Sequence, residues 1–295
     1  MYDTIIIGAG PSGVSTALYL KSKGDNILLL EKRAIGGLAE SVTRLTHYTG
    51  LIGHEDGKAF GKRLKKTLDD EKILYKFLEV IGLKKGKDGF KVETKEETFS
   101  AKSVVIAVGN ERILVDVEGK EAFTPYSRDI KEKNDKIAIV CGGSDGACKE
   151  AIYLSDLCKE VHIVEKRDGI FCVDQFKKEI EKRKNIHFHV KSEVEKVVGN
   201  PIKEILILDK KENKVNSIKG DILAFSYIGQ KPKLEFLGDI LPLKDGYIDE
   251  DIVTSIDGLF VSGDCRVKTV RQIATAVSDG AYAAAAAHKY LTLSI

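Results

Sequence analysis

The chain has 295 residues, enough for two domains of ordinary size with a hydrophobic core in each. Its 47 Lys and Arg nearly balance its 45 Asp and Glu, and the net charge of +2 excludes a strong field that would recruit nucleic acid or a membrane surface. No run of about 18 apolar residues and no secretion signal is present, so we expect a cytoplasmic protein. In a reducing compartment the five cysteines are expected to be buried, metal-bound or redox-active.

The N-terminal stretch contains a dinucleotide-binding fingerprint. Its predicted elements are a strand, a helix and a second strand, at residues 4–7, 14–21 and 26–30. The loop between the first strand and the helix is G-x-G-x-x-G: Gly8 allows a tight turn, Gly10 lets the backbone approach a diphosphate, and Gly13 lets the helix pack on the strand. Glu31 ends the second strand, where an acid accepts hydrogen bonds from a ribose diol.

The middle of the chain is predicted to contain further elements of the same domain, followed by the crossing to a second domain. We predict a helix, two strands, a hairpin and a buried apolar strand, at residues 58–70, 73–77, 78–83, 90–101 and 104–109. The adjacent Gly36 and Gly37 indicate either close backbone approach to a flat group or an ordinary turn. The irregular, polar residues 110–135 are expected to contain the crossing to a second domain.

The opening pattern then repeats. A strand, a glycine-rich turn, a helix and another strand are predicted at residues 136–141, 142–147, 148–156 and 161–164, and Glu165 ends the last of them. Later segments predict two apolar strands and an alanine-rich helix, at residues 222–228, 259–264 and 270–290. We therefore predict an α/β fold of two Rossmann-like (three-layer ββα/βα) nucleotide-binding domains, with the second inserted in the first.

Several short motifs along the chain match the pattern of one known family, and they are residues 8–13, 36–37, 107–109, 229–232, 255–264, 271–273 and 278–280. On these residues the chain resembles, over nearly its whole length, the low-molecular-weight thioredoxin reductase family. The resemblance implies an FAD-binding domain of residues 1–112 and 243–295 and an inserted pyridine-nucleotide-type domain of residues 113–242. It also implies non-covalent FAD and a homodimer.

The resemblance implies a set of FAD-binding residues, with Asp264 on the ribityl chain and the backbone near Gln272 and Ile273 facing the isoalloxazine. His47 stands where relatives usually place an asparagine near the flavin. The expected cofactor-binding residues are Gly8, Gly10, Pro11, Ser12, Gly13, Glu31, Gly36, Gly37, Leu38, His47, Ala107, Gly109, Gly263, Asp264, Arg271, Gln272 and Ile273.

The chain departs from the family pattern in its second half. The family's Cys-x-x-Cys dithiol is absent, because residues 126–129 read Tyr-Ser-Arg-Asp. Ser144 replaces the second essential glycine of the second loop, where a side chain crowds a diphosphate. Glu165 would repel a 2′-phosphate, and Phe171 removes an arginine that would bind one. These departures argue against binding of NADPH. Binding of NADH is compatible with Glu165, but Ser144 does not favour it.

The cysteines at the second loop are candidates for relocated redox chemistry. Cys141 ends one predicted strand and Cys148 begins the following helix, so we hypothesise that they form a redox-active pair; the alternative is two small buried residues beside a turn. Cys265 is a weaker redox candidate, whereas Cys158 and Cys172 are expected to be structural. His187 and His189 share one face of a short strand, but with no third ligand apparent we predict no metal site and thus no metal cofactor.

Two functions stay open, and the first is favoured. In the first, a ferredoxin-type or flavodoxin donor passes electrons through FAD to a Cys141–Cys148 disulfide and on to a thioredoxin-type protein, which resembles the ferredoxin-dependent flavin thioredoxin reductases of anaerobes. In the second, the chain is an FAD-dependent NADH (or NAD(P)H) oxidoreductase or ferredoxin reductase without thiol chemistry. A regulatory or scaffold FAD-binding protein is a third alternative. Neither nucleic acid nor membrane is expected as a partner.

Overall fold

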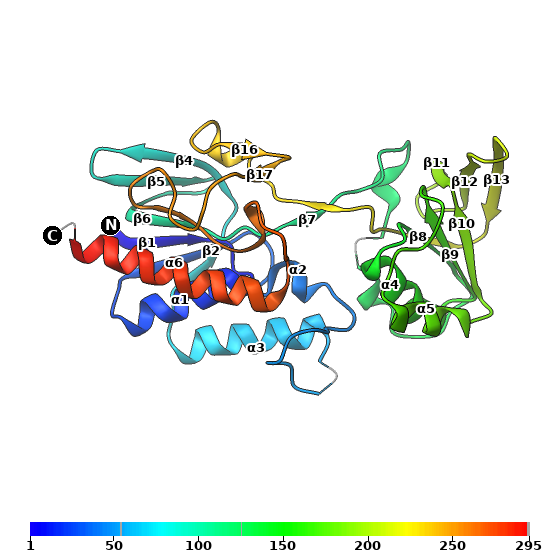
Figure 1. Ribbon diagram of the computed structural model, residues 1–295, viewed down its shortest axis with the longest axis horizontal. Helices are drawn as coiled ribbons and strands as arrows, with labels where there is room; N and C mark the ends of the chain where they lie inside the picture. Colours follow the sequence, from blue (N-terminus) through cyan, green and yellow to red (C-terminus); the bar gives the residue numbers. More distant parts are fainter. Residues whose placement is uncertain (54, 125, 294–295) are drawn as a thin grey trace. The chain divides into compact units, whose positions relative to one another are not determined.

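A computed structural model describes residues 1–53, 55–124 and 126–293. The chain divides into two compact units, each of which is described by itself: unit 1 is Met1–Glu111 with Lys231–Ile295, and unit 2 is Arg112–Gln230. Each unit is an α/β structure built on a mainly parallel sheet with a layer of further structure on either face (Figure 1). The predicted fold class is confirmed.

Unit 1 has one large sheet, in the order β3-β2-β1-β6-β5-β4, and β18 also pairs with β6. Its strands β1, β2, β3, β6 and β18 run parallel, while β4 and β5 form an antiparallel extension. Its elements are β1 (Tyr2–Ile7), α1 (Pro11–Ser22), β2 (Ile27–Glu31), α2 (Gly37–Glu40), α3 (Gly57–Asp70), β3 (Tyr75–Phe77), β4 (Val80–Gly86), β5 (Gly89–Thr94), β6 (Thr98–Ile106), η3 (Glu235–Leu237), β16 (Leu243–Lys244), β17 (Tyr247–Ile248), β18 (Leu259–Val261), η4 (Gly263–Cys265) and α6 (Ile273–Leu293).

Alternation along β1 divides the unit 1 core between the two faces of the sheet. Ile5 and Ile7 pack with β4, β5 and the segment around η3, whereas Ile6 packs with the helices α1 and α6. Those helices lie side by side, as Figure 1 shows, and small residues let their backbones approach. A Cβ on Gly280 of α6 would lie 2.3 Å from the Ser12 carbonyl oxygen. The close contact places the start of α1 beside the loop that follows β18.

Unit 2 has a parallel sheet in the order β10-β9-β8-β14. Helices α4 and α5 cover one face, and the antiparallel meander β11-β12-β13 covers the other. Its elements are η1 (Lys120–Ala122), η2 (Ser127–Asp129), β8 (Ile137–Cys141), α4 (Asp145–Ser155), β9 (Glu160–Glu165), α5 (Asp174–Glu181), β10 (Ile186–Val190), β11 (Ser192–Val198), β12 (Glu204–Asp209), β13 (Lys214–Lys219) and β14 (Ile222–Ser226), and the chain crosses between the units at β7 (Glu111–Arg112) and β15 (Gln230–Lys231).

The second chain crossing lies earlier than the sequence predicted. We expected unit 2 to end at residue 242, but it ends at Gln230. The reason is packing, because Leu234, Leu237 and Leu241 are buried in the core of unit 1. Residues 231–242 therefore belong to the unit that contains the first glycine loop, where they contribute to the wall of its pocket.

Candidate functional site

Two glycines of the first loop are required by packing. Gly8 has φ +104°, and a Cβ there would lie 2.4 Å from the Ala107 carbonyl oxygen. A Cβ on Gly13 would lie 1.8 Å from the Gly8 carbonyl oxygen, so only glycine lets α1 sit this close to the turn. These contacts agree with the roles that the fingerprint predicts for the first and third glycines.

Packing does not explain the glycine at position 10. Gly10 caps α1 with φ −70° and ψ −178°, a conformation open to any residue, and a Cβ there would meet nothing within 4 Å. The open space lies at the N-terminus of α1, where unpaired N–H groups favour an anion. Gly37 borders it, since a Cβ on Gly37 would lie 3.2 Å from the Gly10 Cα. The arrangement is a cradle that fits a diphosphate.

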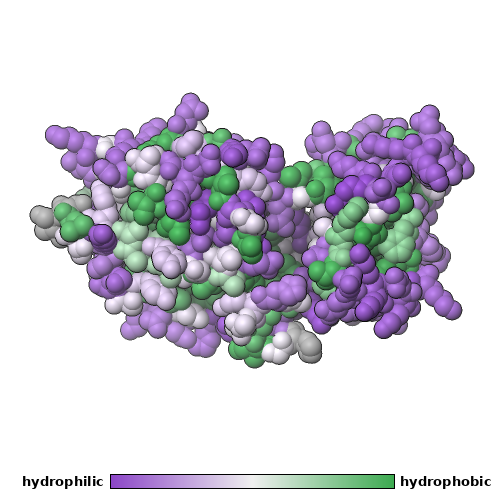
Figure 2. Space-filling model, viewed as in Figure 1, coloured by the Kyte–Doolittle hydropathy of each residue, from purple (hydrophilic) through white to green (hydrophobic). Residues whose placement is uncertain are grey.

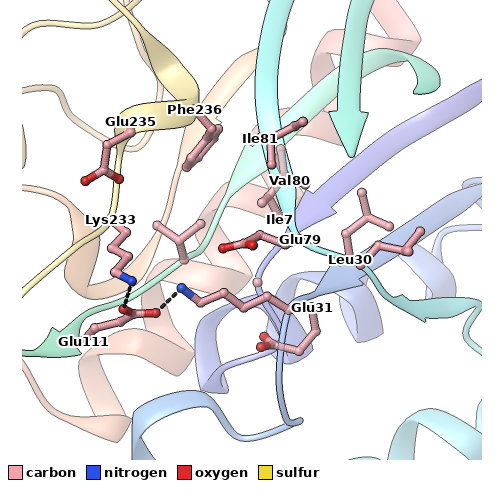
Figure 3. A pocket seen from close by; sticks show the side chains of 14 residues that line it. Ile7, Leu30, Glu31, Glu79, Val80, Ile81, Glu111, Lys233, Glu235 and Phe236 are labelled. Atoms are coloured by element: carbon pink, nitrogen blue, oxygen red, sulfur yellow. Dashed lines mark ion pairs between the residues drawn. The ribbon is translucent and has the colours of Figure 1, made fainter. Parts of the chain in front are cut away.

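The carboxylate of Glu31 lies at the edge of this loop. The side chain is only 8 % exposed and accepts hydrogen bonds from the backbone N–H groups of Ala9 at 2.8 Å and Arg33 at 2.9 Å. Because these bonds fix its orientation and a carboxylate accepts several more, Glu31 can also bind a ribose diol. Glu31 and Gly8 both line a cavity of about 280 Å³ (Figure 3).

Sequence reasoning missed most of the wall of this cavity. The residues it missed are Ile7, Leu30, Lys32, Leu78, Glu79, Val80, Ile81, Val108, Glu111, Lys233, Glu235 and Phe236. Lys32 and Lys233 both form ion pairs with Glu111, the second at 3.0 Å. Burial acts to raise the pKa of Glu111, but hydrogen bonds from these two lysines hold it below its ordinary value. With its apolar walls and the Glu31 carboxylate, the cavity fits the adenosine half of a dinucleotide.

A second part of unit 1 brings an acceptor without a hydrogen bond near the start of α1. The hydroxyl groups of Ser12 and Ser262 hydrogen-bond each other, which ties α1 to the strand before Asp264. Among the described residues, the buried Oδ1 of Asp264 has no hydrogen-bond partner, and Lys268 Nζ lies 3.7 Å away. Burial raises the pKa of Asp264. A buried acceptor without a donor fits the hydroxyl groups of a ribityl chain.

The remaining predicted residues have less direct roles. Arg271 donates to the backbone carbonyls of Asp264 and Arg266 and stacks over the Tyr247 ring at 4.1 Å, so it holds the loop that precedes α6. His47 is exposed with φ +60°, and its Nδ1 lies 3.4 Å from the hydroxyl of its neighbour Thr46, so its role at the flavin stays a prediction. The other predicted residues are Leu38 in α2, Ala107 and Gly109 after β6, Gly263 in η4, and Gln272 and Ile273 at the start of α6.

The second glycine loop forms the same turn as the first, but a serine side chain stands where the first loop leaves room for a diphosphate. Gly142 has φ +115°, and a Cβ there would lie 2.5 Å from the Tyr227 carbonyl oxygen, as at Gly8. Ser144 caps α4 with φ −88° and ψ 178°, close to the conformation of Gly10. Because the two backbones match, the Ser144 side chain projects into the space that Gly10 leaves open for a diphosphate.

A neighbouring loop closes the second cradle further. The N–H of Phe171 donates to the Gly143 carbonyl at 2.8 Å, and the N–H of Val173 donates to the carboxylate of Asp145 at 2.8 Å. Asp145 is the first residue of α4, so it places a negative charge where a diphosphate would bind. Both features disfavour an anion at this loop.

Glu165 is engaged by its own neighbour. Its carboxylate accepts from the Arg167 guanidinium at 3.0 and 2.9 Å, and the guanidinium lies 4.2 Å from the centre of the Phe171 ring. Burial acts to raise the pKa of Glu165, but the Arg167 hydrogen bonds hold it below its ordinary value. The acid expected to bind a ribose in this unit is therefore ion-paired already.

The packing of the two side chains argues against the predicted Cys141–Cys148 pair. Cys141 packs on the sheet face covered by the β11-β12-β13 meander, whereas Cys148 packs on the face covered by α4 and α5. Alternation along β8 explains the separation, since Val140 faces the helices and Cys141 faces away. Cys148 instead shares a buried cluster with Cys172, which we expected to be structural, and Cys172 acts to raise the pKa of Cys148.

All five cysteines are buried free thiols. Burial raises the pKa of Cys141, Cys148, Cys158 and Cys265, so these four are protonated at neutral pH. The Cys265 thiol donates to the backbone carbonyls of Ser262 at 3.4 Å and Ile106 at 3.7 Å, which indicates a packing role.

The histidines of unit 2 also differ from the prediction. We predicted no metal site because no third ligand accompanied His187 and His189. The parallel strand β9 supplies two more groups, Glu160 and His162, and His162 is the register partner of His187. The assumption that no third ligand lies near His187 and His189 is therefore wrong.

The intact first loop, the adenosine-sized cavity and the unpaired Asp264 acceptor fit FAD, and with the fold they define a two-unit flavin-dependent oxidoreductase. The pattern of the pyridine nucleotide-disulphide oxidoreductase family matches residues 2–280. The chain is 30 % identical to a thioredoxin reductase of Treponema pallidum, over 98 % of this chain and 97 % of that protein. It is 31 % identical to the 34.2 kDa protein in the rubredoxin operon of Clostridium pasteurianum, over 98 % and 97 %.

Solved structures agree. A thioredoxin reductase of Lactococcus lactis superposes with a TM-score of 0.89 at 29 % identity, over 99 % of this chain and 100 % of that one. The chain belongs to the pyridine nucleotide-disulphide oxidoreductase family, and the resemblance to thioredoxin reductases is confirmed. In the described part of the chain, no helix has the length and apolar character needed to cross a membrane, and hydrophilic residues cover most of the face shown in Figure 2.

Proposed function

We propose that this chain is a flavin-dependent disulfide reductase that takes its electrons from a protein donor of the ferredoxin or flavodoxin type rather than from NADPH. Bound FAD supplies a group that takes up electrons singly and releases them in pairs. In the overall reaction two reduced one-electron donors, one disulfide and two protons give two oxidised donors and a dithiol. The acceptor in this proposal is a thioredoxin-type protein, which the names of several relatives support.

The contrast between the two loops carries the proposal. The first cradle is open at Gly10, whereas Ser144 fills the corresponding space in the second. Asp145 adds a negative charge at the start of α4, and the family resemblance implies an arginine where this chain has Phe171. A chain that keeps its flavin cradle and fills its pyridine-nucleotide cradle needs another source of electrons.

For an internal dithiol, we propose Cys148 and Cys172 in place of the Cys141–Cys148 pair. Both residues lie in the same core cluster beneath α4 and α5, and Cys172 acts to raise the pKa of Cys148. Hydrogen bonds from Phe171 and Val173, on either side of Cys172, fix it against the loop that precedes Cys148. Reduction of a Cys148–Cys172 disulfide consumes two electrons and two protons, and exchange with a partner disulfide restores it.

One observation favours the alternative, an FAD-dependent NADH oxidoreductase without thiol chemistry. Glu165 ends β9 at the position where an acid binds the free 2′-hydroxyl of NADH, and its ion pair with Arg167 is partly exposed. The burial of all five thiols also suits this alternative. A homodimer, implied by the family resemblance, is a further part of the proposal, and light scattering of the purified protein tests it.

An anaerobic titration of the FAD-loaded protein distinguishes the protein-donor proposal from the NADH oxidoreductase alternative. We expect flavin absorbance to bleach with a reduced ferredoxin or flavodoxin but not with NADPH or NADH. Prompt bleaching by micromolar NADH would contradict the protein-donor proposal and support the alternative.

Two matched variants of Ser144 test whether its side chain is what prevents reduction of the flavin by NADH. Ser144→Gly reopens the cradle and should increase the rate of flavin reduction by NADH, whereas Ser144→Ala keeps the Cβ and should not. Equal rates in both variants would show that the serine side chain is not the obstacle.

Cysteine variants test the dithiol separately. Cys148→Ser and Cys172→Ser should abolish thioredoxin reduction while flavin reduction by the protein donor continues, and Cys141→Ser serves as a matched buried control. Reduction of thioredoxin by the Cys148→Ser variant at the unchanged rate would exclude this pair and leave the donor proposal standing.

A further inference from the structure

Four polar side chains gather on one face of unit 2, away from its glycine loop. Strands β9 and β10 are parallel neighbours at the edge of the sheet, and His162 is the register partner of His187. Because side chains two apart share a face, Glu160 lies beside His162, and His189 lies beside His187. One ligand atom from each of Glu160, His162 and His187 lies within 4.8 Å of the others.

His162 lies at the centre of the cluster. The residue is 9 % exposed, and its ring stacks on those of His187 and His189, with centroids 4.9 and 5.2 Å apart. Its Nδ1 lies 3.0 Å from Nε2 of His189, which is hydrogen-bonding distance. Within the described chain its buried Nε2 has no hydrogen-bond partner, and it lies 3.5 Å from Oε2 of Glu160. A buried nitrogen without a hydrogen bond, beside a carboxylate, is a pair of donor atoms that suits a cation.

The two ring nitrogens of His162 then have separate roles. When Nδ1–H donates to His189, the tautomer is fixed and the lone pair of Nε2 points toward Glu160. Metal-binding histidines regularly donate their second nitrogen in this way, which orients the ring.

The separation of the donor atoms suits a small transition-metal ion. Zinc lies about 2.0–2.1 Å from its nitrogen and oxygen ligands, so neighbouring ligands of a tetrahedron are about 3.3 Å apart. His162 Nε2 and Glu160 Oε2 are already 3.5 Å apart. His187 is exposed, so its ring is free to move the remaining distance and an ion can enter from solvent. Lys159 Nζ lies 3.8 Å from the other oxygen of Glu160 and leaves Oε2 to the ion.

We propose that Glu160, His162 and His187 bind a divalent transition-metal ion, Zn²⁺ or a close analogue, with His189 as the positioning residue for His162. Two imidazoles and one carboxylate leave a fourth tetrahedral position for water. Imidazole ligands favour zinc, copper and nickel over calcium and magnesium, which prefer oxygen. The site is independent of the flavin and of the proposed electron donor.

Metal binding to the untagged, FAD-loaded full chain tests the proposal. After treatment with a chelator, the protein should bind one Zn²⁺ per chain in calorimetry, and Co²⁺ should give the visible spectrum of a tetrahedral nitrogen–oxygen site. His187→Ala and Glu160→Gln should each weaken binding at least about tenfold. The matched control His288→Gln, which removes a histidine of unit 1, should bind Zn²⁺ as the unaltered chain does.

The positioning role of His189 has its own readout. His189→Gln should weaken Zn²⁺ binding by about 10–100-fold while the Co²⁺ spectrum keeps its tetrahedral character, because all three ligands are retained. Circular dichroism and the flavin spectrum verify that each variant folds. No stoichiometric Zn²⁺ binding, or equal binding by His187→Ala and the unaltered chain, would overturn the proposal.

Discussion

Replacing Gly10 by serine gives the first loop the residue that the second loop has at Ser144. The φ of −70° suits any residue and a Cβ meets nothing within 4 Å, so the FAD-free variant should fold with its free energy of unfolding changed by less than about 1 kcal/mol. A diphosphate in the cradle would meet the added side chain, and overpacking of this kind costs about 1–3 kcal/mol. The Kd for FAD should therefore rise about 5–150-fold.

Two measurements on the FAD-free protein separate affinity from stability. Titration followed by flavin fluorescence gives the Kd, and urea unfolding gives the free energy of unfolding. Gly13→Ala is the contrasting variant, because its Cβ would lie 1.8 Å from the Gly8 carbonyl oxygen, and it should lose at least about 3 kcal/mol of stability. If Gly10→Ser binds FAD with unchanged affinity, the open space is not the diphosphate site, and the argument drawn from Ser144 fails with it.

Two other changes in unit 1 have opposite expected effects on stability. Asp264→Ala should leave the FAD-free protein at least as stable in urea, because it removes a buried carboxylate and Lys268 keeps its bond to Asp279 at 3.0 Å, yet it should weaken FAD binding by about 1.5–3 kcal/mol, measured by fluorescence titration. Hydrogen bonds from Arg63 hold the pKa of Glu55 below its ordinary value, so the stability that this pair contributes is present above that value and lost as pH falls through the lower folded pKa. Arg63→Gln should cost about 1–3 kcal/mol at neutral pH and move acid unfolding, followed by circular dichroism, to higher pH; an unchanged acid transition would contradict the assignment.

The first loop could be predicted from sequence because its signals are local. Gly8, Gly10, Gly13 and Glu31 follow one another through a single strand-helix-strand unit, and backbone sterics fix what each position requires. The wall of the cavity could not be predicted in the same way. Lys233 reaches it from a segment more than 200 residues further along the chain, and only the packing of η3 on the sheet brings that segment there.

The predicted cysteine pair shows which structural information is missing from the spacing of residues along the sequence. Cys141 and Cys148 are close in sequence, and a turn between strand and helix brings their backbones near each other. Each residue of β8 points to the face opposite its neighbour's, so a shift of one position decides whether a side chain meets α4 or the meander. Cys172 lies 24 positions beyond Cys148 and reaches it because the loop after β9 returns to the start of α4. Proximity in a sheet depends on face and register as much as on distance along the chain.

The same reasoning explains why the histidine cluster could not be predicted from the sequence. Alternation along one strand identifies His187 and His189 as neighbours, but their third and fourth companions come from another strand, in a register that periodicity does not specify. Parallel pairing of His162 with His187 places a buried, unsatisfied nitrogen beside Glu160. Unit 2 thus combines a filled nucleotide cradle at one loop with a donor set at its sheet edge that no nucleotide requires. The metal site that we propose and the glycine loop therefore occupy different parts of unit 2.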